Sequence, residues 1–564
     1  MKFKDFKYER VDVNALKTQV NQIKEVMRQA CDYATFKAAF DQYGELSAHV
    51  ATMMSLGNVR YTIDTRDEFY KNENDFWDNN SPLIQAIDNE FNQTVLSSKF
   101  VEELKKDVPE TYFLNAEFAQ KAFDEKIVPD LQEENKLASA YQALIASSQI
   151  EFDGETYTLA SIGSKMEDNN RDVRKRAMKA YWDWFSDHES ELDDIYDRMV
   201  KVRDGMAKKL GYKNFIKLGY YRMRRFDYNA DDVANYRKQI LEDIVPVANK
   251  LYAAQAQRLG YNKLACYDEK VEFLSGNPTP KHNKDEMVKY AQKMYHELSP
   301  ETGAFFDFMV EHDLLDLVAK PGKAGGGYCT GFPEYKAPFI FSNFNGTSGD
   351  VDVLTHEAGH AFQVFSSFDI KPVECIWPTY ESCEIHSMSM EFFTHPWMHG
   401  FFEEDTDKYY YLHPASAVKF LPYGILIDHY QHEVYEHPEM TPDERKAAFR
   451  KLEKMYLPHK DYEGFDILEK GCWWYRQLHV FMDPFYYVDY TLAQVCALQF
   501  WIRMLDNDPE AFNDYYKICK IGGTKTFKEI VKAANLKIPF EDGCLKEVVA
   551  RLNTYFDDFK DKAL

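Results

Sequence analysis

The sequence lacks the cysteine spacing of a disulfide-stabilised or sulfur-ligated fold. It has nine cysteines in 564 residues, and no two of them form a C-x-x-C pair. This pattern argues against a disulfide framework and against a structural metal held by cysteine thiolates. The sequence also has no run of about 18 apolar residues, and its first residues carry no apolar secretory segment. We therefore expect a protein of the cytoplasm that does not associate with membranes.

Basic residues are also in short supply. Lysine and arginine number 68 against 92 aspartates and glutamates, so the formal net charge is −24. An acidic chain with scattered basic residues disfavours binding to nucleic acid and to anionic membranes. No fixed-period repeat or low-complexity linker divides the chain. A globular enzyme fits this composition, because 45% hydrophobic residues are enough for more than one core.

What the sequence does contain is a metal-binding motif, His356-Glu357-Ala358-Gly359-His360. Two histidines four residues apart share one face of a helix and can close on one zinc ion, while the glutamate faces the bound water. The aromatic residues 339–346 predict a strand and an Asn-Gly turn before this helix. Gly359 costs about 1 kcal/mol relative to alanine inside a helix, which indicates close contact with a second helix. The motif predicts a zinc peptidase with one Zn²⁺ per chain.

Two histidines leave a catalytic zinc one protein ligand short, because such sites usually have three. The longer motif with a third histidine is absent, since Ser366 stands at the position that it requires. The following segment offers three carboxylates and two weaker candidates: Glu381, Glu384, Glu391, His386 and His395. We favour Glu384 as the third ligand. An acidic helix face without a metal is the alternative.

Four segments taken together resemble those of one family. They are residues 326–329, 339–347 and 352–363, and the pair Glu384 and Glu391, which are seven residues apart. The resemblance is to the M3 metallopeptidases, within them to the oligoendopeptidase F branch and its Pz-peptidase-like bacterial members. It extends from about residue 160 to the C-terminus.

The resemblance implies a role for each residue of the site. His356, His360 and Glu384 would bind zinc, Glu357 would be the general base, and Glu391 would support the site. It also implies oligopeptide substrates that are cut internally.

The same family places a histidine and tyrosines on a later segment, where they stabilise the tetrahedral intermediate. In this sequence the corresponding segment is 479–490, and the resemblance gives this role to His479 and to tyrosines near it. We favour Tyr487 and Tyr490 over Tyr486, because residues three apart share a helix face.

The expected fold is mainly α-helical with a small β element. Apolar periodicity predicts helices from residue 14 to about 145, with breaks near Pro82, Pro109 and Pro129, then from 171 to 258, and again beyond Glu381. Residues 150–159 alternate around Asp-Gly and predict a hairpin. The resemblance adds a two-lobed helical zincin like thimet oligopeptidase and neurolysin, with a deep central channel. We place the N-terminal lobe at residues 1–180 and the catalytic domain at 181–564.

Two other functions stay open on the sequence alone. A zinc exopeptidase of the carboxypeptidase type would need a fixed charge to hold a peptide terminus, and the sequence identifies none. A non-catalytic helical scaffold that binds peptides would have a structural metal with four protein ligands, and Glu357 would then have no role. The favoured function is a metalloendopeptidase for short peptides, and the number of subunits is not predicted.

Overall fold

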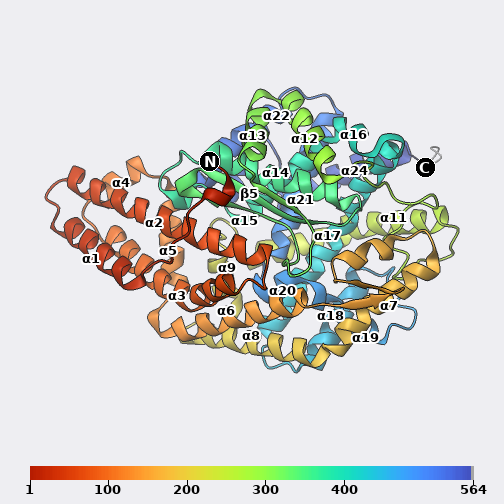
Figure 1. Cartoon of the computed structure of the whole chain (residues 1–564), viewed down its shortest axis with the longest axis horizontal. Coiled ribbons are helices and arrows are strands. Elements are labelled where there is room, and N and C mark those ends of the chain that lie inside the picture. The colour runs from red at the N-terminus through yellow and green to blue at the C-terminus, as the bar shows by residue number, and fades with distance from the viewer. Residues whose placement is uncertain (560–564) are drawn as a thin grey trace.

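A computed structural model of the chain describes residues 1–559, and helices dominate it, as predicted. The first six α-helices lie together on one side of the molecule (Figure 1, red to orange). They are α1 (Val13–Gln29), α2 (Tyr33–Ile63), α3 (Glu68–Leu96), α4 (Val101–Asp107), α5 (Glu110–Ala122) and α6 (Val128–Ala146). The predicted hairpin follows and is confirmed, with β1 (Ile150–Phe152) antiparallel to β2 (Glu155–Tyr157).

The prolines of this region divide the helices only in part. Pro109 is the N-cap residue of α5 and Pro129 lies in the first turn of α6, as predicted. The predicted break at Pro82 is wrong, because α3 continues through it. Trp77, Pro82 and Ile84 of this helix are buried, so packing outweighs the ~3 kcal/mol that a proline costs inside a helix.

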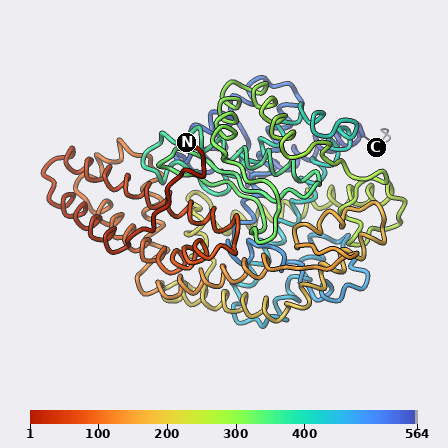
Figure 2. Tube along the Cα trace, in the orientation of Figure 1, coloured from red at the N-terminus to blue at the C-terminus, as the bar shows by residue number. Residues whose placement is uncertain are grey.

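The middle of the chain leads into a three-stranded sheet. Seven helices precede it: α7 (Arg171–Asp187), α8 (Glu189–Lys209), α9 (Phe215–Arg222), α10 (Ala230–Gln239), α11 (Val245–Arg258), α12 (Lys284–Leu298) and α13 (Pro300–Glu311). Strand β5 (Ala337–Phe344) lies in the centre, parallel to β3 (Leu315–Val318) and antiparallel to β4 (Tyr328–Phe332). Strand β4 packs against α2, and Figure 2 shows the sheet segment (green) beside the N-terminal helices. The strand predicted before the motif helix is confirmed as β5.

Helices form the rest of the described chain. They are α14 (Gly349–Ser367), α15 (Tyr380–Phe393), α16 (His399–Phe402), α17 (Thr406–Glu436), α18 (Pro442–Tyr456), α19 (Asp466–Glu469), α20 (Leu478–Met482), α21 (Tyr487–Leu505), α22 (Ala511–Ile521), α23 (Phe527–Ala533) and α24 (Cys544–Asp557). The motif helix α14 packs against β4 and β5 and against α15, which in turn packs against α21.

One large buried apolar core contains residues from Phe6 to Phe559, and Ala256, Leu259, Leu264 and Val271 form a small separate cluster. No break in packing therefore marks the lobe boundary near residue 180, which stays a prediction. Within residues 1–559, no helix combines the length and the apolar character that crossing a membrane requires.

Helices α14 and α15 are in close contact at Gly359. A Cβ atom added there would lie 2.6 Å from the carbonyl oxygen of His386 and 2.6 Å from the Cα of Ser387. Both are backbone atoms of α15, so no side-chain rotation could make room. The second helix predicted from this glycine is α15, and the prediction is confirmed.

Replacing this glycine should therefore weaken the protein. We expect Gly359→Ala to lower the free energy of unfolding by about 1–3 kcal/mol, the usual cost of overpacking a tight interior. The measurement is urea unfolding followed by circular dichroism. The matched control is Gly205→Ala in α8, where nothing lies within 4 Å of the added Cβ, so stability should hold or rise. Equal stability of Gly359→Ala and the wild type would contradict the close contact.

Candidate active site

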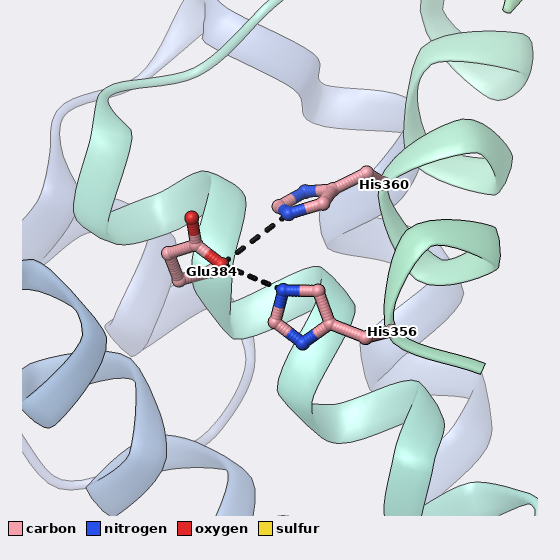
Figure 3. Close-up of side chains that lie close together, drawn as sticks. All are labelled: His356, His360 and Glu384. Carbon is pink, nitrogen blue, oxygen red and sulfur yellow. Dashed lines mark ion pairs between the residues drawn. The ribbon is translucent and has the colours of Figure 1, made fainter. Parts of the chain in front are cut away.

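Three donor atoms from two helices converge at one point (Figure 3). His356 and His360 project from α14, and Glu384 projects from α15. The Oε2 atom of Glu384 lies 3.2 Å from Nε2 of His356 and 3.3 Å from Nε2 of His360. The three donor atoms lie within 4.8 Å of one another, and in residues 1–559 no other group of His, Cys, Asp or Glu meets this condition. The structure thus brings the three predicted ligands together.

The spacing of these atoms suits a zinc ion. Donors bound to one tetrahedral zinc at about 2.0–2.2 Å lie roughly 3.3–3.6 Å from each other. The two nitrogen–oxygen separations of 3.2 and 3.3 Å are close to that range. Two imidazoles and one carboxylate are the donors of a catalytic zinc site, in which the fourth position stays open, whereas a structural site has four protein ligands.

The other candidate ligands of α15 lie apart from this cluster. Both carboxylate oxygens of Glu381 are buried without a hydrogen-bond partner, and this side chain lies close enough to Asp489 and Arg225 to feel their charges. His386 donates from Nδ1 to the carbonyl oxygen of Ser382 at 2.7 Å. Neither side chain contributes a donor atom to the group formed with the motif histidines.

Glu391 connects the motif to a buried pair of histidines. Its Oε1 atom lies 2.6 Å from Nδ1 of His356, and its Oε2 atom lies 2.7 Å from Nε2 of His413. Nε2 of His395 in turn lies 2.9 Å from Nδ1 of His413. A carboxylate in this place orients the ring of a metal ligand through the nitrogen that does not face the metal. Sequence reasoning missed His413, because its contact with Glu391 spans 22 residues and follows no helical spacing.

The carboxyl groups of the site differ in their pKa values. Burial would raise the pKa of Glu384, but the charges and hydrogen bonds of His360 and His356 lower it well below its ordinary value. Glu391 behaves in the same way, because its two histidine partners outweigh burial and lower its pKa. For Glu357, burial outweighs the neighbouring imidazoles and raises the pKa. The pKa is therefore lowered at two carboxyl groups of the site and raised at the third.

A cavity of about 380 Å³ lies beside the cluster. Its walls are formed by Arg224, Gly327, Tyr328, Cys329, Thr330, His356, Glu357, His360, Trp377, Pro378, Tyr380, Cys383, Glu384, Tyr486 and Tyr490. Glu357 is buried, and its Oε2 atom has no hydrogen-bond partner among the described residues. The backbone of Gly327 closes in on the same carboxylate, since a Cβ there would lie 3.4 Å from its Oε1 atom. A reactive group in this cavity would meet Glu357 directly.

The later segment reaches the cavity through Tyr486 and Tyr490. The hydroxyl of Tyr486 donates to Oε1 of Glu384 at 2.5 Å. The structure places Tyr487, which we favoured from the sequence, outside this cavity, where its ring packs against Phe420. Residues 486 and 490 are four apart at the start of α21 and share a helix face, which explains why Tyr486 accompanies Tyr490.

Hydrogen bonds fix the tautomer of His479. Tyr423 donates to Oε1 of Gln477 at 3.0 Å, and Nε2 of Gln477 donates to Nδ1 of His479 at 3.0 Å. The neutral ring therefore carries its proton on Nε2, which lies 3.0 Å from the oxygen of Tyr490. Burial lowers the pKa of His479 and favours this neutral form. Because Tyr490 accepts from His479, its own proton is available to an acceptor in the cavity.

Comparison with known sequences matches most of the chain to two profiles of one peptidase family. The family profile described as Peptidase family M3 matches residues 164–550, and the profile described as Peptidase M3 N-terminal domain matches residues 3–123. An oligoendopeptidase F homolog of Borreliella burgdorferi is 21% identical over 552 residues, which cover 91% of this chain and 89% of the relative.

Comparison with solved structures extends the match to the fold. PZ peptidase A, solved with an inhibitor, has a TM-score of 0.98 and 50% identity, with 99% of this chain and 100% of that chain covered. Oligoendopeptidase-F from Enterococcus faecium has a TM-score of 0.64 at 14% identity, with 97% of each chain covered, which is a likeness in fold alone. The predicted helical fold of the M3 zincin type is confirmed.

Proposed function

The chain belongs to peptidase family M3, and on this premise we propose that it is a zinc-dependent endopeptidase that cuts oligopeptides internally. Its family makes it a metallo-oligopeptidase of the oligoendopeptidase F type. The observation that carries the proposal is the convergence of Nε2 of His356, Nε2 of His360 and Oε2 of Glu384 beside the unpartnered carboxylate of Glu357.

We assign the zinc ion to His356, His360 and Glu384. When bound, zinc lowers the pKa of a water molecule and polarises the carbonyl group of the bond to be cut. The protein prepares the donors for this ion. Glu391 holds Nδ1 of His356, which leaves Nε2 free to face the metal, and Tyr486 donates to the outer oxygen of Glu384.

Glu357 moves the protons of the reaction. Its buried Oε2 atom has no hydrogen-bond partner among the described residues, so it can accept a proton from the attacking water. Burial raises the pKa of Glu357 and so favours its protonated form. The same carboxyl group can then donate the proton to the leaving amine. One group thus acts first as base and then as acid.

Tyr490 and His479 stabilise the charge that grows on the carbonyl oxygen. Tyr490 lines the cavity, and His479 donates to its oxygen, which leaves the phenol proton free to bond to an oxyanion. Donors fixed in advance stabilise such a charge more than water does, because they need not reorient during the reaction. Tyr487 is not part of this role, since its ring lies outside the cavity wall.

One observation favours an exopeptidase of the carboxypeptidase type as a second candidate. Arg224 lines the same cavity and forms no ion pair within 4.0 Å among residues 1–559, so it could hold the carboxylate of a terminal residue. The position of the cut separates the two functions, because an endopeptidase releases two peptides and an exopeptidase releases one amino acid at a time. Mass spectrometry of the products identifies which occurs. The non-catalytic scaffold is excluded by membership of this peptidase family.

Glu357→Gln tests the general base. The amide keeps the shape of the side chain but cannot accept a proton, so kcat should fall by about 10²- to 10⁴-fold. Zinc content and thermal unfolding serve as controls and should match the wild type. A variant that retains more than about a tenth of wild-type turnover would contradict the assignment, because loss of a general base should lower kcat at least about 100-fold.

Glu384→Ala tests the third ligand. The variant should lose stoichiometric zinc, because two imidazoles alone leave the ion without its charged donor. Metal analysis after dialysis against a buffered zinc solution gives the result. Glu381→Gln is the matched control on the same helix and should keep its zinc. Retention of zinc by Glu384→Ala together with its loss from Glu381→Gln would show that the wrong carboxylate has been assigned.

Tyr490→Phe tests the stabilisation of the oxyanion. Removing one such donor costs about 2.7–4 kcal/mol in other hydrolases, so kcat should fall by about 10²- to 10³-fold while KM changes little. Tyr487→Phe is the matched control and should leave kcat within about twofold of the wild type, because this phenol lies outside the cavity. A larger fall in kcat for Tyr487→Phe than for Tyr490→Phe would contradict this assignment and make Tyr487 the donor.

A further inference from the structure

A second cavity lies apart from the metal cluster. Its volume is about 340 Å³, and it shares no lining residue with the cavity at Glu357. Its walls come from the short helices η3 (Ser161–Glu167) and η9 (Trp473–Arg476), from α7, α11 and α17, and from the loop after α11. Aromatic rings form much of the wall, among them Trp182, Tyr252, Tyr423 and Trp473. Four cations and three carboxylates also face it: Lys270, Lys419, Lys460, Arg476, Glu167, Glu269 and Glu272.

Most of these charges are already paired. Lys419 lies 2.8 Å from Glu272, and Lys460 lies 2.6 Å from Glu269. Lys270 and Arg476 are different, because neither forms an ion pair within 4.0 Å among residues 1–559. Lys270 is exposed and Arg476 is partly buried, so an anionic ligand that enters the cavity can reach both cations.

Arg476 is held in place by aromatic groups instead of a carboxylate. Its guanidinium lies over the ring of Trp473 at 4.8 Å, and the phenols of Tyr423 and Tyr181 are its hydrogen-bonding neighbours. The pKa of Lys270 is lowered, chiefly by desolvation in the cavity wall and to a smaller extent by the charge of Arg476, although Glu167 opposes this effect. Glu167 lies in the same wall but forms no ion pair within 4.0 Å among residues 1–559, so it is not in contact with either cation.

We propose that Arg476 and Lys270 bind the C-terminal carboxylate of the oligopeptide substrate. This inference rests on the proposed function, because it takes an oligopeptide as the ligand. A guanidinium can donate two parallel hydrogen bonds to a carboxylate, and an ammonium group can donate a third. The aromatic wall can pack against the side chains that precede the terminus.

The second cavity is linked to the reacting groups through neighbouring side chains. Tyr423, a neighbour of Arg476, donates to Gln477, which donates to His479 beside Tyr490. The two cavities share no lining residue, so a peptide held by its carboxylate at Arg476 would have to extend out of the second cavity to reach the metal cluster. The cut would then fall at a fixed number of residues from the C-terminus, and it would be internal.

The experiment compares pairs of peptides that differ only in a free or an amidated C-terminus. For the wild type, we expect kcat/KM to be about 10- to 100-fold higher for the free acid, as charge-assisted hydrogen bonds predict. In Lys270→Gln and Arg476→Gln, kcat/KM for the free-acid peptide should fall to the value for the amidated peptide. The value for the amidated peptide should stay nearly unchanged. Glu167→Gln should increase the preference for the free acid. Residues added at the N-terminus should not move the cut, whereas residues added at the C-terminus should.

Two further variants control for charge and for the other cavity. Lys263→Gln removes an exposed cation that pairs with Asp461 at 3.0 Å, outside both cavity walls, and should not alter the ratio of acid to amide. Arg224→Gln tests the cation in the cavity at Glu357. If only this variant loses the preference for the free-acid peptide, the carboxylate binds at Arg224 and not at Arg476 and Lys270. A binding measurement by calorimetry in the Glu357→Gln background reports the same preference without turnover.

The outcomes separate the two proposals. Equal cleavage of acid and amide by the wild type, or an acid preference that survives in both Lys270→Gln and Arg476→Gln, would overturn the carboxylate site and leave the peptidase intact. Release of single C-terminal residues would overturn it in favour of the exopeptidase. Failure of the wild type to cut any peptide in the presence of zinc would contradict the proposed function itself.

Discussion

The contact between α14 and α15 at Gly359 is the constraint on which the site depends. Gly359 precedes His360, and the backbone atoms that it faces, at His386 and Ser387, follow Glu384 by two and three residues. The two helices can therefore approach until the imidazoles of one and the carboxylate of the other are 3.2–3.3 Å apart. A side chain at 359 would separate these donors, because packed interiors do not yield without cost. The packing of α14 against α15 therefore also sets the spacing of the three donor atoms.

Helix α15 also places the remaining groups around that interface. It contacts α14 on one side and α21 on another, so Tyr486 and Tyr490 reach the cavity that the motif residues line. Burial of charge is compensated at the two ionised carboxylates, since Glu384 and Glu391 each face two imidazoles. Buried charges without such partners are costly. Glu357, which has an unpartnered oxygen and a raised pKa, is the group that the surrounding structure leaves free to react.

Much of this arrangement follows from local sequence patterns. The motif helix, the strand before it, the hairpin near residue 150 and the contact at Gly359 each depend on residues that are close in sequence or on the backbone freedom of glycine. Other features depend on distant packing. The rotation of α21 decides between Tyr486 and Tyr487, and the partner of Glu391 lies 22 residues away at His413. The unpaired cations of the second cavity also could not be predicted from local sequence. Their neighbours pair across segments more than a hundred residues apart, such as Glu272 and Lys419.

The most direct test of the account is the coordination of zinc in the reconstituted protein. X-ray absorption at the zinc edge, combined with anomalous diffraction, identifies the donor atoms and the residues that supply them. We expect one zinc ion per chain, bound by Nε2 of His356, Nε2 of His360, a carboxylate oxygen of Glu384 and one oxygen from water. A site closed by four protein ligands would contradict the account, and so would sulfur from Cys329 or Cys383, which line the same cavity.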